Sequence, residues 1–190
     1  TELLVEVTLQ ALEGRSAPHV LDLGTGSGAI AISIALARPD AVVLATDVST
    51  AALEVAKENA RRLGAAVRFV AGSWYDALSG HEDFDAVVSN PPYIAQCDRH
   101  LTQGDVRFEP VNALTDGADG LNAFRAIVSG SQCRLRPGGV MFFEHGWDQA
   151  DAVRCLLKQA RFTRVETMPD LAGIDRVTGG YLPISIVEEA

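Results

Sequence analysis

Short apolar runs alternate along the chain with longer stretches whose apolar residues recur at helical spacing. A short run bounded by turn residues is typical of a strand buried on both faces, and the helical spacing is typical of an amphipathic helix. The runs predict strands at 19–23, 42–46, 67–70, 85–89, 140–144, 163–168 and 181–187. The stretches between them predict helices at 3–12, 29–38, 50–63, 121–136 and 149–159. This alternation predicts an α/β fold with a mostly parallel sheet covered by helices on both faces.

Glycine, proline and small polar residues separate these elements. Ser49 or Thr50 is expected to cap the helix that Gly64 ends, and residues 137–139, Pro-Gly-Gly, predict a turn. The polar, glycine-containing segment 169–180 is expected to join the last two strands as a loop. Residues 94–120 show little periodicity, and so long an irregular stretch in a compact domain is usually a functional loop or lid.

The composition fits a single globular domain spanning residues 1–190. Hydrophobic residues make up 47% of the chain and charged residues 22%, which excludes a disordered protein. No signal peptide is visible in the sequence and no apolar run approaches the roughly 20 residues of a membrane span, so no membrane partner is expected. The net charge of -9 argues against a stable nucleic-acid partner, because such proteins usually cluster Lys and Arg.

The cysteines indicate a reducing compartment. Cys97, Cys133 and Cys155 form no metal-binding pair, and the histidines are scattered, so we expect reduced thiols, a cytoplasmic location and no metal site. The chain begins at Thr1 without a Met and enters what reads as the middle of a helix, so we expect a longer parent protein.

A glycine-rich loop at residues 24–28, Gly-Thr-Gly-Ser-Gly, joins the first strand to the second helix. Such a loop lets the backbone approach a ligand closely, although taken alone it is a weak signal for a nucleotide site. Asp47 ends the second strand, where a carboxylate can accept hydrogen bonds from both ribose hydroxyls. A solvated, helix-capping Asp47 is the alternative. The two features together favour a nucleotide-type ligand at the carboxyl edge of the sheet.

The Asn-Pro-Pro-Tyr corner, Asn90 to Tyr93, follows the fourth strand. Two prolines cannot continue the strand, so the corner must leave the sheet in a rigid, extended form. It either holds an Asn carboxamide and a Tyr ring in fixed directions or is merely a stiffened turn. Because Asn90 lies at the same edge as the glycine loop, the first interpretation is favoured.

The spacing of the glycine loop distinguishes two kinds of nucleotide. Asp22 precedes a Gly-x-Gly-x-Gly pattern, which resembles the first motif of class I S-adenosylmethionine-dependent methyltransferases. An NAD-dependent dehydrogenase is the competing interpretation, but it gives no reason for the Asn-Pro-Pro-Tyr corner. Trp74, just past the third strand, either lies against an adenine or is an ordinary half-buried aromatic.

Further segments resemble one family, the peptide chain release factor glutamine methyltransferases. They span nearly the whole chain, at 22–31, 89–94, 104–110, 113–117, 144–146 and 170–176. The resemblance implies a Rossmann-like class I methyltransferase fold with a seven-stranded, mostly parallel sheet whose seventh strand is antiparallel. It implies methylation of the glutamine amide in the Gly-Gly-Gln motif of release factors, with S-adenosyl-L-methionine as cofactor and S-adenosyl-L-homocysteine as product. The family's small N-terminal helical domain is not represented in this sequence.

The same resemblance implies site residues. Those expected to bind the cofactor are Asp22, Gly24, Thr25, Gly26, Ser27, Gly28, Asp47, Val48, Ser73, Trp74 and Asn90. Those expected to bind the acceptor are Asn90, Pro91, Pro92 and Tyr93, which are also the expected catalytic residues, and Phe108 at the entrance.

Three other residues and two other functions remain open at this point. Glu109, Glu144 and His145 are either a catalytic base or, as we favour, anchors of loops and strand ends. An N-methyltransferase acting on an exocyclic base amine of RNA or DNA would share the Asn-Pro-Pro-Tyr corner. An inactive cofactor-binding module would keep the glycine loop.

Overall fold

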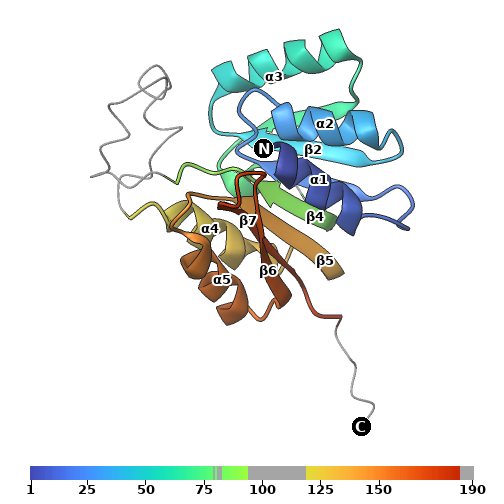
Figure 1. The fold of residues 1–190 in the computed structure, drawn as a ribbon. Coiled ribbons are helices and arrows are strands. Elements are labelled where there is room, and N and C mark those ends of the chain that lie inside the picture. Colours follow the sequence, from blue (N-terminus) through green and yellow to red (C-terminus); the bar gives the residue numbers. More distant parts are fainter. Residues whose placement is uncertain (79, 81–82, 94–118, 185–190) are drawn as a thin grey trace.

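The computed structural model describes residues 1–78, 80, 83–93 and 119–184. Within them, one seven-stranded sheet has the order β3-β2-β1-β4-β5-β7-β6 (Figure 1). The strands are β1 (His19–Leu23), β2 (Val42–Asp47), β3 (Val67–Ala71), β4 (Phe84–Ser89), β5 (Leu135–Glu144), β6 (Thr163–Pro169) and β7 (Asp175–Tyr181). The helices are α1 (Glu2–Ala11), α2 (Ala29–Ala37), α3 (Thr50–Leu63), α4 (Asn122–Ser131) and α5 (Ala150–Gln159), with a 3-10 turn η1 (Trp74–Ala77).

The strands are parallel except for β7, which runs antiparallel to both β5 and β6. After β1 the chain adds β2 and β3 on one side, and then crosses back to add β4 and β5 on the other. The point where the order reverses lies between β1 and β4, and ligands in open α/β sheets bind at such a point. The predicted fold class, including the antiparallel seventh strand, is confirmed.

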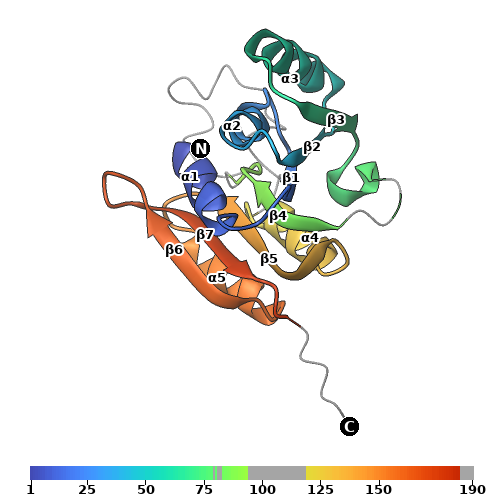
Figure 2. The same ribbon diagram turned by 90° about the vertical axis from the view of Figure 1, so that its right-hand side faces the viewer.

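Helices cover both faces of the sheet (Figures 1 and 2). On one face α1 and α2 pack with Val20, Val43 and Val88 into one apolar core. On the other face α4 and α5 pack with Leu21 and alternating residues of β4 and β5 into a second core. Successive strand residues point to opposite faces, so a strand buried on both sides must be apolar throughout, which explains why the strands read as short continuous runs.

The seventh strand differs from the prediction. We expected it at 181–187 after a loop at 169–180, but β7 occupies Asp175–Tyr181 and residues 170–174 form the turn. Gly179 and Gly180 suggested a loop, whereas the structure needs glycine there because a Cβ at Gly179 would overlap the Phe142 ring and the Met141 carbonyl. Gly179 therefore marks a close approach of neighbouring strands.

The fourth helix is also shorter than predicted, because α4 ends at Ser131 instead of near residue 136. Leu135 is buried and already pairs with Phe84, and the ladder then shifts register before Val140 pairs with Ala86. The Pro-Gly-Gly segment at 137–139 is thus part of an irregularity inside β5 and does not precede the strand. Apolar periodicity could not separate Leu135 on a strand from Leu135 on a helix.

The other elements lie within one or two residues of their expected ends. Ser49, not Thr50, caps α3, since its side chain accepts a hydrogen bond from the Ala52 N–H, and Gly64 ends the helix in a left-handed conformation. Among the described residues, no helix has both the length and the apolar character needed to cross a membrane.

A charge cluster around the buried Asp85 lies at the amino ends of the strands, opposite the carboxyl edge. Asp85, only 7% exposed, accepts hydrogen bonds from Arg15 Nη1 (2.9 Å), Arg136 Nη1 (2.6 Å) and the His19 N–H (2.8 Å). Arg15 also donates to the Gly138 carbonyl at 2.6 Å. The cluster therefore joins the loop after α1 to β1, β4 and β5.

Candidate active site

Three chain segments leave the sheet side by side at its carboxyl edge. In the ladder Leu23 of β1 pairs with Thr46 of β2 on one side and with Ser89 of β4 on the other. The glycine loop, Asp47 and Asn90 follow these residues directly or end the same strand, so they emerge together. The Ser89 hydroxyl donates to the Leu23 carbonyl at 2.7 Å and fixes the end of β4 to the end of β1.

Asp47 holds the glycine loop in place. Its Oδ2 accepts a hydrogen bond from the Gly26 N–H at 2.8 Å, and its Oδ1 accepts one from the Ser49 N–H at 2.8 Å. The side chain is only half-buried, so each oxygen keeps a lone pair for a further donor. Asp47 can therefore anchor the loop and accept ligand hydroxyls at once.

The glycine loop is open at Gly26 and tightly packed at Gly28. A Cβ at Gly26 would meet nothing within 4 Å, whereas a Cβ at Gly28 would lie 2.9 Å from Ile32 Cδ1 and 3.1 Å from Ala56 Cβ. Gly28, with φ +86°, begins α2 and lets it lie close to α3. The loop thus combines an accessible backbone with a rigid base, which is the arrangement of a cradle for a polar ligand.

Asp22 is a buried acid beneath this loop. Its Oδ2 accepts a hydrogen bond from the Thr25 hydroxyl at 2.6 Å, while its Oδ1 has no hydrogen-bond partner within the described residues. Burial raises the pKa of Asp22 to about 7, and this outweighs the opposing effects of the Thr25 hydroxyl and of the nearby Ala31 backbone N–H. A buried oxygen with an unused lone pair fits a site that accepts a hydrogen bond or positive charge from a ligand.

Trp74 lies against the glycine loop. Its ring atom Cζ3 would be 3.3 Å from a Cβ at Gly24. The adjacent Tyr75 fixes this turn, because its hydroxyl donates to the Ile127 carbonyl of α4 at 3.0 Å and its ring packs on Gly130. Trp74 is half-buried, so part of an aromatic surface remains beside the loop.

The Asn-Pro-Pro-Tyr corner begins where β4 ends. Asn90 is half-buried, Pro91 is buried, and Tyr93 packs against the core cluster beneath α4 and α5. The carboxamide of Asn90 is therefore held on a short, stiff segment next to the strand that carries the glycine loop.

The structure also places a residue here that the sequence did not single out. Gln149, just before α5, donates from Nε2 to the Tyr93 carbonyl at 2.9 Å and accepts at Oε1 from the Gly146 N–H at 3.0 Å. Nothing in the local sequence distinguishes Gln149 from an ordinary helix-flanking polar residue.

His145 lies at the end of β5 and both its ring nitrogens are engaged. Nδ1 lies 2.8 Å from the Gly146 carbonyl and Nε2 lies 2.8 Å from the Thr178 hydroxyl. Burial lowers the pKa of His145, so the ring is neutral, and because a carbonyl can only accept, Nδ1 carries the proton. This arrangement supports the anchoring interpretation of His145 over a catalytic base.

The remaining candidates are more peripheral. Ser27, Val48 and Ser73 are exposed around the loop and the strand ends, with Val48 at 76% exposure. Thr25 is buried, and its hydroxyl is directed to Asp22. Phe108 and Glu109, with most of the expected lid, lie outside the described residues.

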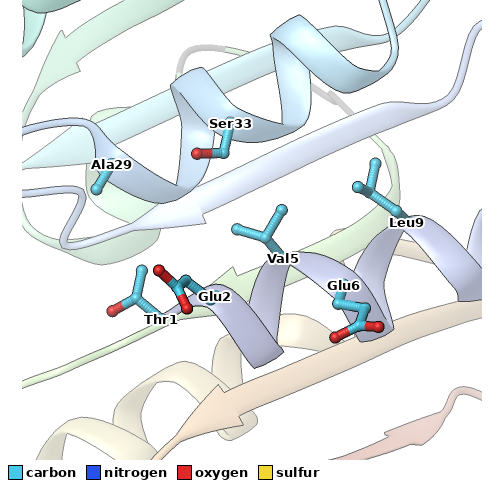
Figure 3. Close-up of a pocket in the computed structure, with 7 residues that line it drawn as sticks. All are labelled: Thr1, Glu2, Val5, Glu6, Leu9, Ala29 and Ser33. Carbon is cyan, nitrogen blue, oxygen red and sulfur yellow. The ribbon is translucent and has the colours of Figure 1, made fainter.

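A separate groove of about 530 Å³ lies between α1 and α2 (Figure 3). Figure 3 shows Val5 and Leu9 of α1 directed towards α2, which contributes Ala29 and Ser33. Thr1, Glu2 and Glu6 complete the lining. None of the predicted site residues is among those that line it in the described chain.

Comparisons with known proteins identify relatives of this chain. Residues 1–108 match the family model "Methyltransferase small domain". The release factor glutamine methyltransferase of Bordetella pertussis is 61% identical over 182 residues, covering 96% of this chain and 67% of that protein. The protein of the same name from Burkholderia pseudomallei is 56% identical, covering 96% of this chain and 66% of that protein. The chain thus spans about two thirds of the length of these relatives.

Solved structures agree with the sequence comparison. A release factor-specific protein-(glutamine-N5) methyltransferase from Alicyclobacillus acidocaldarius is 33% identical, has a TM-score of 0.59, and is matched over 96% of this chain and 91% of its own. A 16S rRNA methyltransferase from T. thermophilus has a TM-score of 0.68 at 24% identity, over 95% of this chain and 42% of its own. The second likeness concerns the fold alone.

Proposed function

We propose that this chain, which belongs to the release factor glutamine methyltransferase family, methylates the side-chain amide of a glutamine in a peptide chain release factor. The expected target is the glutamine of the Gly-Gly-Gln motif, and S-adenosylmethionine is the expected methyl donor. The observation that carries the proposal is the Asn-Pro-Pro-Tyr corner emerging beside the glycine loop at the carboxyl edge of the sheet. This arrangement supports a site in which the corner holds a planar nitrogen next to a nucleoside held by the glycine loop.

The residues at the edge fit the donor. S-adenosylmethionine would supply an electrophilic methyl group on a positively charged sulfur. The open backbone at Gly26, the lone pairs of Asp47 and the exposed part of the Trp74 ring would hold its nucleoside portion. Asp22 and the glycine loop would face its charged end, since Asp22 Oδ1 has no hydrogen-bond partner among the residues that the structure describes.

The chemical problem is the weak nucleophilicity of an amide nitrogen, whose lone pair is delocalised into the carbonyl. The Asn90 Oδ1 and the Pro91 carbonyl can each accept one N–H of the glutamine amide, which orients the nitrogen towards the donor site. Tyr93 can pack on the flat amide group. Correct positioning of the amide nitrogen against the donor methyl group can raise the rate by several orders of magnitude. The rigidity of the corner is therefore its main proposed contribution to catalysis.

The release factor is the proposed partner, and the cytoplasm is the proposed location. The two cysteines of the described residues, Cys133 and Cys155, are exposed and free, which is compatible with a reducing compartment. We propose no stable nucleic-acid partner, in keeping with the net charge of -9.

The decisive experiment compares methyl transfer to different acceptors. The chain is incubated with radiolabelled S-adenosylmethionine and, separately, with a release factor, the same release factor with its Gly-Gly-Gln glutamine replaced by alanine, rRNA, tRNA and DNA. We expect label in the wild-type release factor but not in its glutamine-to-alanine variant. Label in nucleic acid alone would replace the proposal with an N-methyltransferase acting on bases. Cofactor binding without transfer to any of these acceptors would contradict catalysis by this chain.

A further inference from the structure

Gln149 contacts three separate backbone segments near the Asn-Pro-Pro-Tyr corner. Its Nε2 donates to the Tyr93 carbonyl at 2.9 Å and to the Gly120 carbonyl at 3.3 Å, and its Oε1 accepts from the Gly146 N–H at 3.0 Å. Tyr93 ends the corner, Gly120 precedes α4, and Gly146 follows β5. One side-chain amide thus joins three segments, since Tyr93 and Gly120 are 27 positions apart in sequence and Gly120 and Gly146 are 26 apart.

The chemistry of these contacts fixes the orientation of the amide. Two carbonyl oxygens can only accept and a backbone N–H can only donate, so the NH₂ end must face Tyr93 and Gly120 and the oxygen must face Gly146. No other common uncharged side chain of this length supplies two donors at one end and an acceptor at the other. Gln149 is therefore matched to its three partners in chemistry as well as in distance.

The packing around Gln149 leaves little freedom. A Cβ at Gly120 would overlap the Tyr93 carbonyl and lie 2.9 Å from Gln149 Nε2, so only glycine fits between them. A Cβ at Gly146 would lie 3.1 Å from Gln149 Oε1. Glycine on both sides allows the backbones to approach the amide closely enough for hydrogen bonds.

The Gly146 side of this arrangement is itself anchored in the sheet. The Gly146 carbonyl accepts from His145 Nδ1, and the other His145 nitrogen accepts from the Thr178 hydroxyl of β7. The His145 N–H donates to the Arg176 carbonyl at 3.0 Å. Gln149 consequently fixes Tyr93 relative to the paired strands β5 and β7.

We propose that Gln149 is a positioning residue, which holds the carboxyl end of the Asn-Pro-Pro-Tyr corner so that Asn90 and the Pro91 carbonyl are directed at the acceptor nitrogen. This inference rests on the proposed function for its effect on turnover. The contact of Gln149 with Tyr93 is independent of which substrate is methylated.

The test uses Gln149→Glu, which keeps the oxygen that accepts from Gly146 but removes both N–H donors to Tyr93 and Gly120. Gln132→Glu is the matched control, because Gln132 Nε2 likewise donates to one backbone carbonyl, that of Ala160 at 3.0 Å, away from the site. Gln149→Glu is expected to lower kcat on the release factor on the order of 10–100-fold, the size of effect that misplaced reacting groups produce. The Kd for S-adenosylmethionine, measured by calorimetry, should change less than about twofold, and Gln132→Glu should change neither quantity.

A spectroscopic readout separates this inference from the proposed function. The chain has three tyrosines, so 3-fluorotyrosine labelling gives three ¹⁹F signals, and a Tyr93→Phe variant identifies the one from Tyr93. That signal should shift or broaden in Gln149→Glu and in Gln149→Met, a second variant of similar length, and should stay unchanged in Gln132→Glu. If the wild-type chain methylates no release factor while the Tyr93 signal responds, the proposed function fails and the contact stands.

Other outcomes overturn the inference directly. An unchanged Tyr93 signal in both Gln149 variants would show that Gln149 does not hold the corner. A kcat within about threefold of wild type in Gln149→Glu, or a loss found wholly in the cofactor Kd, would show that the contact has no positioning role.

Discussion

Asp47 anchors the glycine loop with the same two oxygens that we propose for ligand binding. One oxygen accepts from the Gly26 N–H and the other from the Ser49 N–H, so a change here affects the shape of the glycine loop as well as a direct contact. We expect Asp47→Ala to weaken S-adenosylmethionine binding by about 1.5–3 kcal/mol, the usual value of a hydrogen bond to a charged group, or somewhat more. Calorimetry measures this, with the exposed Asp76→Ala as control. Unchanged affinity would remove Asp47 from the site.

Asn90 is expected to act on the rate. Replacing it with alanine removes one of the two oxygens proposed to orient the acceptor amide, and we expect turnover to fall on the order of 100-fold or more, as when a preorganised polar contact is lost. Single-turnover assays with a labelled methyl donor measure it. Near-normal turnover would mean that the acceptor nitrogen binds elsewhere.

Asp22 makes stability depend on pH. Burial raises its pKa from 3.8 to about 7, so the folded chain holds this proton where the unfolded chain releases it. The stability that the protonated form contributes is present in full below the unfolded pKa and is lost as pH rises towards the folded one, at up to about 1.4 kcal/mol per pH unit.

Asp22→Asn removes that titration without changing the shape of the side chain. We expect its free energy of unfolding, relative to wild type, to increase by a few kcal/mol between about pH 4 and about pH 7 and then to level off. Urea unfolding of the wild type and of Asp22→Asn at several pH values measures the difference. A difference that stays constant with pH would contradict a protonated Asp22.

The sequence predicted the roles of residues that directly follow a strand in a recognisable motif. It did not predict the roles of residues whose side chains bond to backbone groups distant in sequence. The glycine loop, Asp47 and the Asn-Pro-Pro-Tyr corner follow predicted strands directly, so their meeting at one edge follows from parallel pairing. Gln149 and Ser89 act through backbone groups distant in sequence, at Tyr93 and Leu23, and such partners are visible only once the strands are in register.

At the scale of elements, β7 shows where a local pattern misleads. Its glycines reduce strand propensity, but they occupy a place where β5 leaves no room for a side chain. The apolar residues Leu182 and Ile184, in contrast, follow the strand. Propensity describes a residue by itself, whereas the position of β7 is decided by the space beside Phe142.

Gly179→Ala should therefore be strongly destabilising. Its methyl group would overlap the Phe142 ring and the Met141 carbonyl, and the backbone partner cannot move without opening the β5–β7 ladder. We expect a loss of about 3 kcal/mol or more in the free energy of unfolding, the upper end of overpacking costs. Gly173→Ala in the preceding turn is the control, since a Cβ there meets nothing within 4 Å and adds only the strain of φ +78°. Equal losses in the two variants would contradict the close-packing explanation.

For the whole molecule, the Asp85 charge cluster and the candidate site lie at opposite edges of the sheet. The Asp85 cluster joins the loop after α1 to β1, β4 and β5 at the amino ends of the strands, while the candidate site occupies the carboxyl ends. The sequence predicted this layered fold, but it gave no indication of the cluster, because Arg15 and Arg136 reach Asp85 from segments 70 and 51 residues away.

Asp85→Ala tests that separation. It leaves two half-exposed guanidinium groups and the His19 N–H without their acceptor, and we expect a loss of about 2–4 kcal/mol in stability. Cofactor affinity of the folded variant should remain within about twofold of wild type. The exposed Asp40→Ala, which breaks an ion pair with Arg38, should cost less. A large loss of affinity in folded Asp85→Ala would show that the two edges are coupled.

The strand order has a consequence for how the molecule opens. β1 and β4 have hydrogen-bonded neighbours on both sides, whereas β3 and β6 are the outer strands of the sheet. Amide protons of β1 and β4 should exchange with deuterated water last, and those of β3 and β6 first. The glycine loop and the Asn-Pro-Pro-Tyr corner follow β1 and β4, so local unfolding of the outer strands β3 and β6 would leave the proposed site intact.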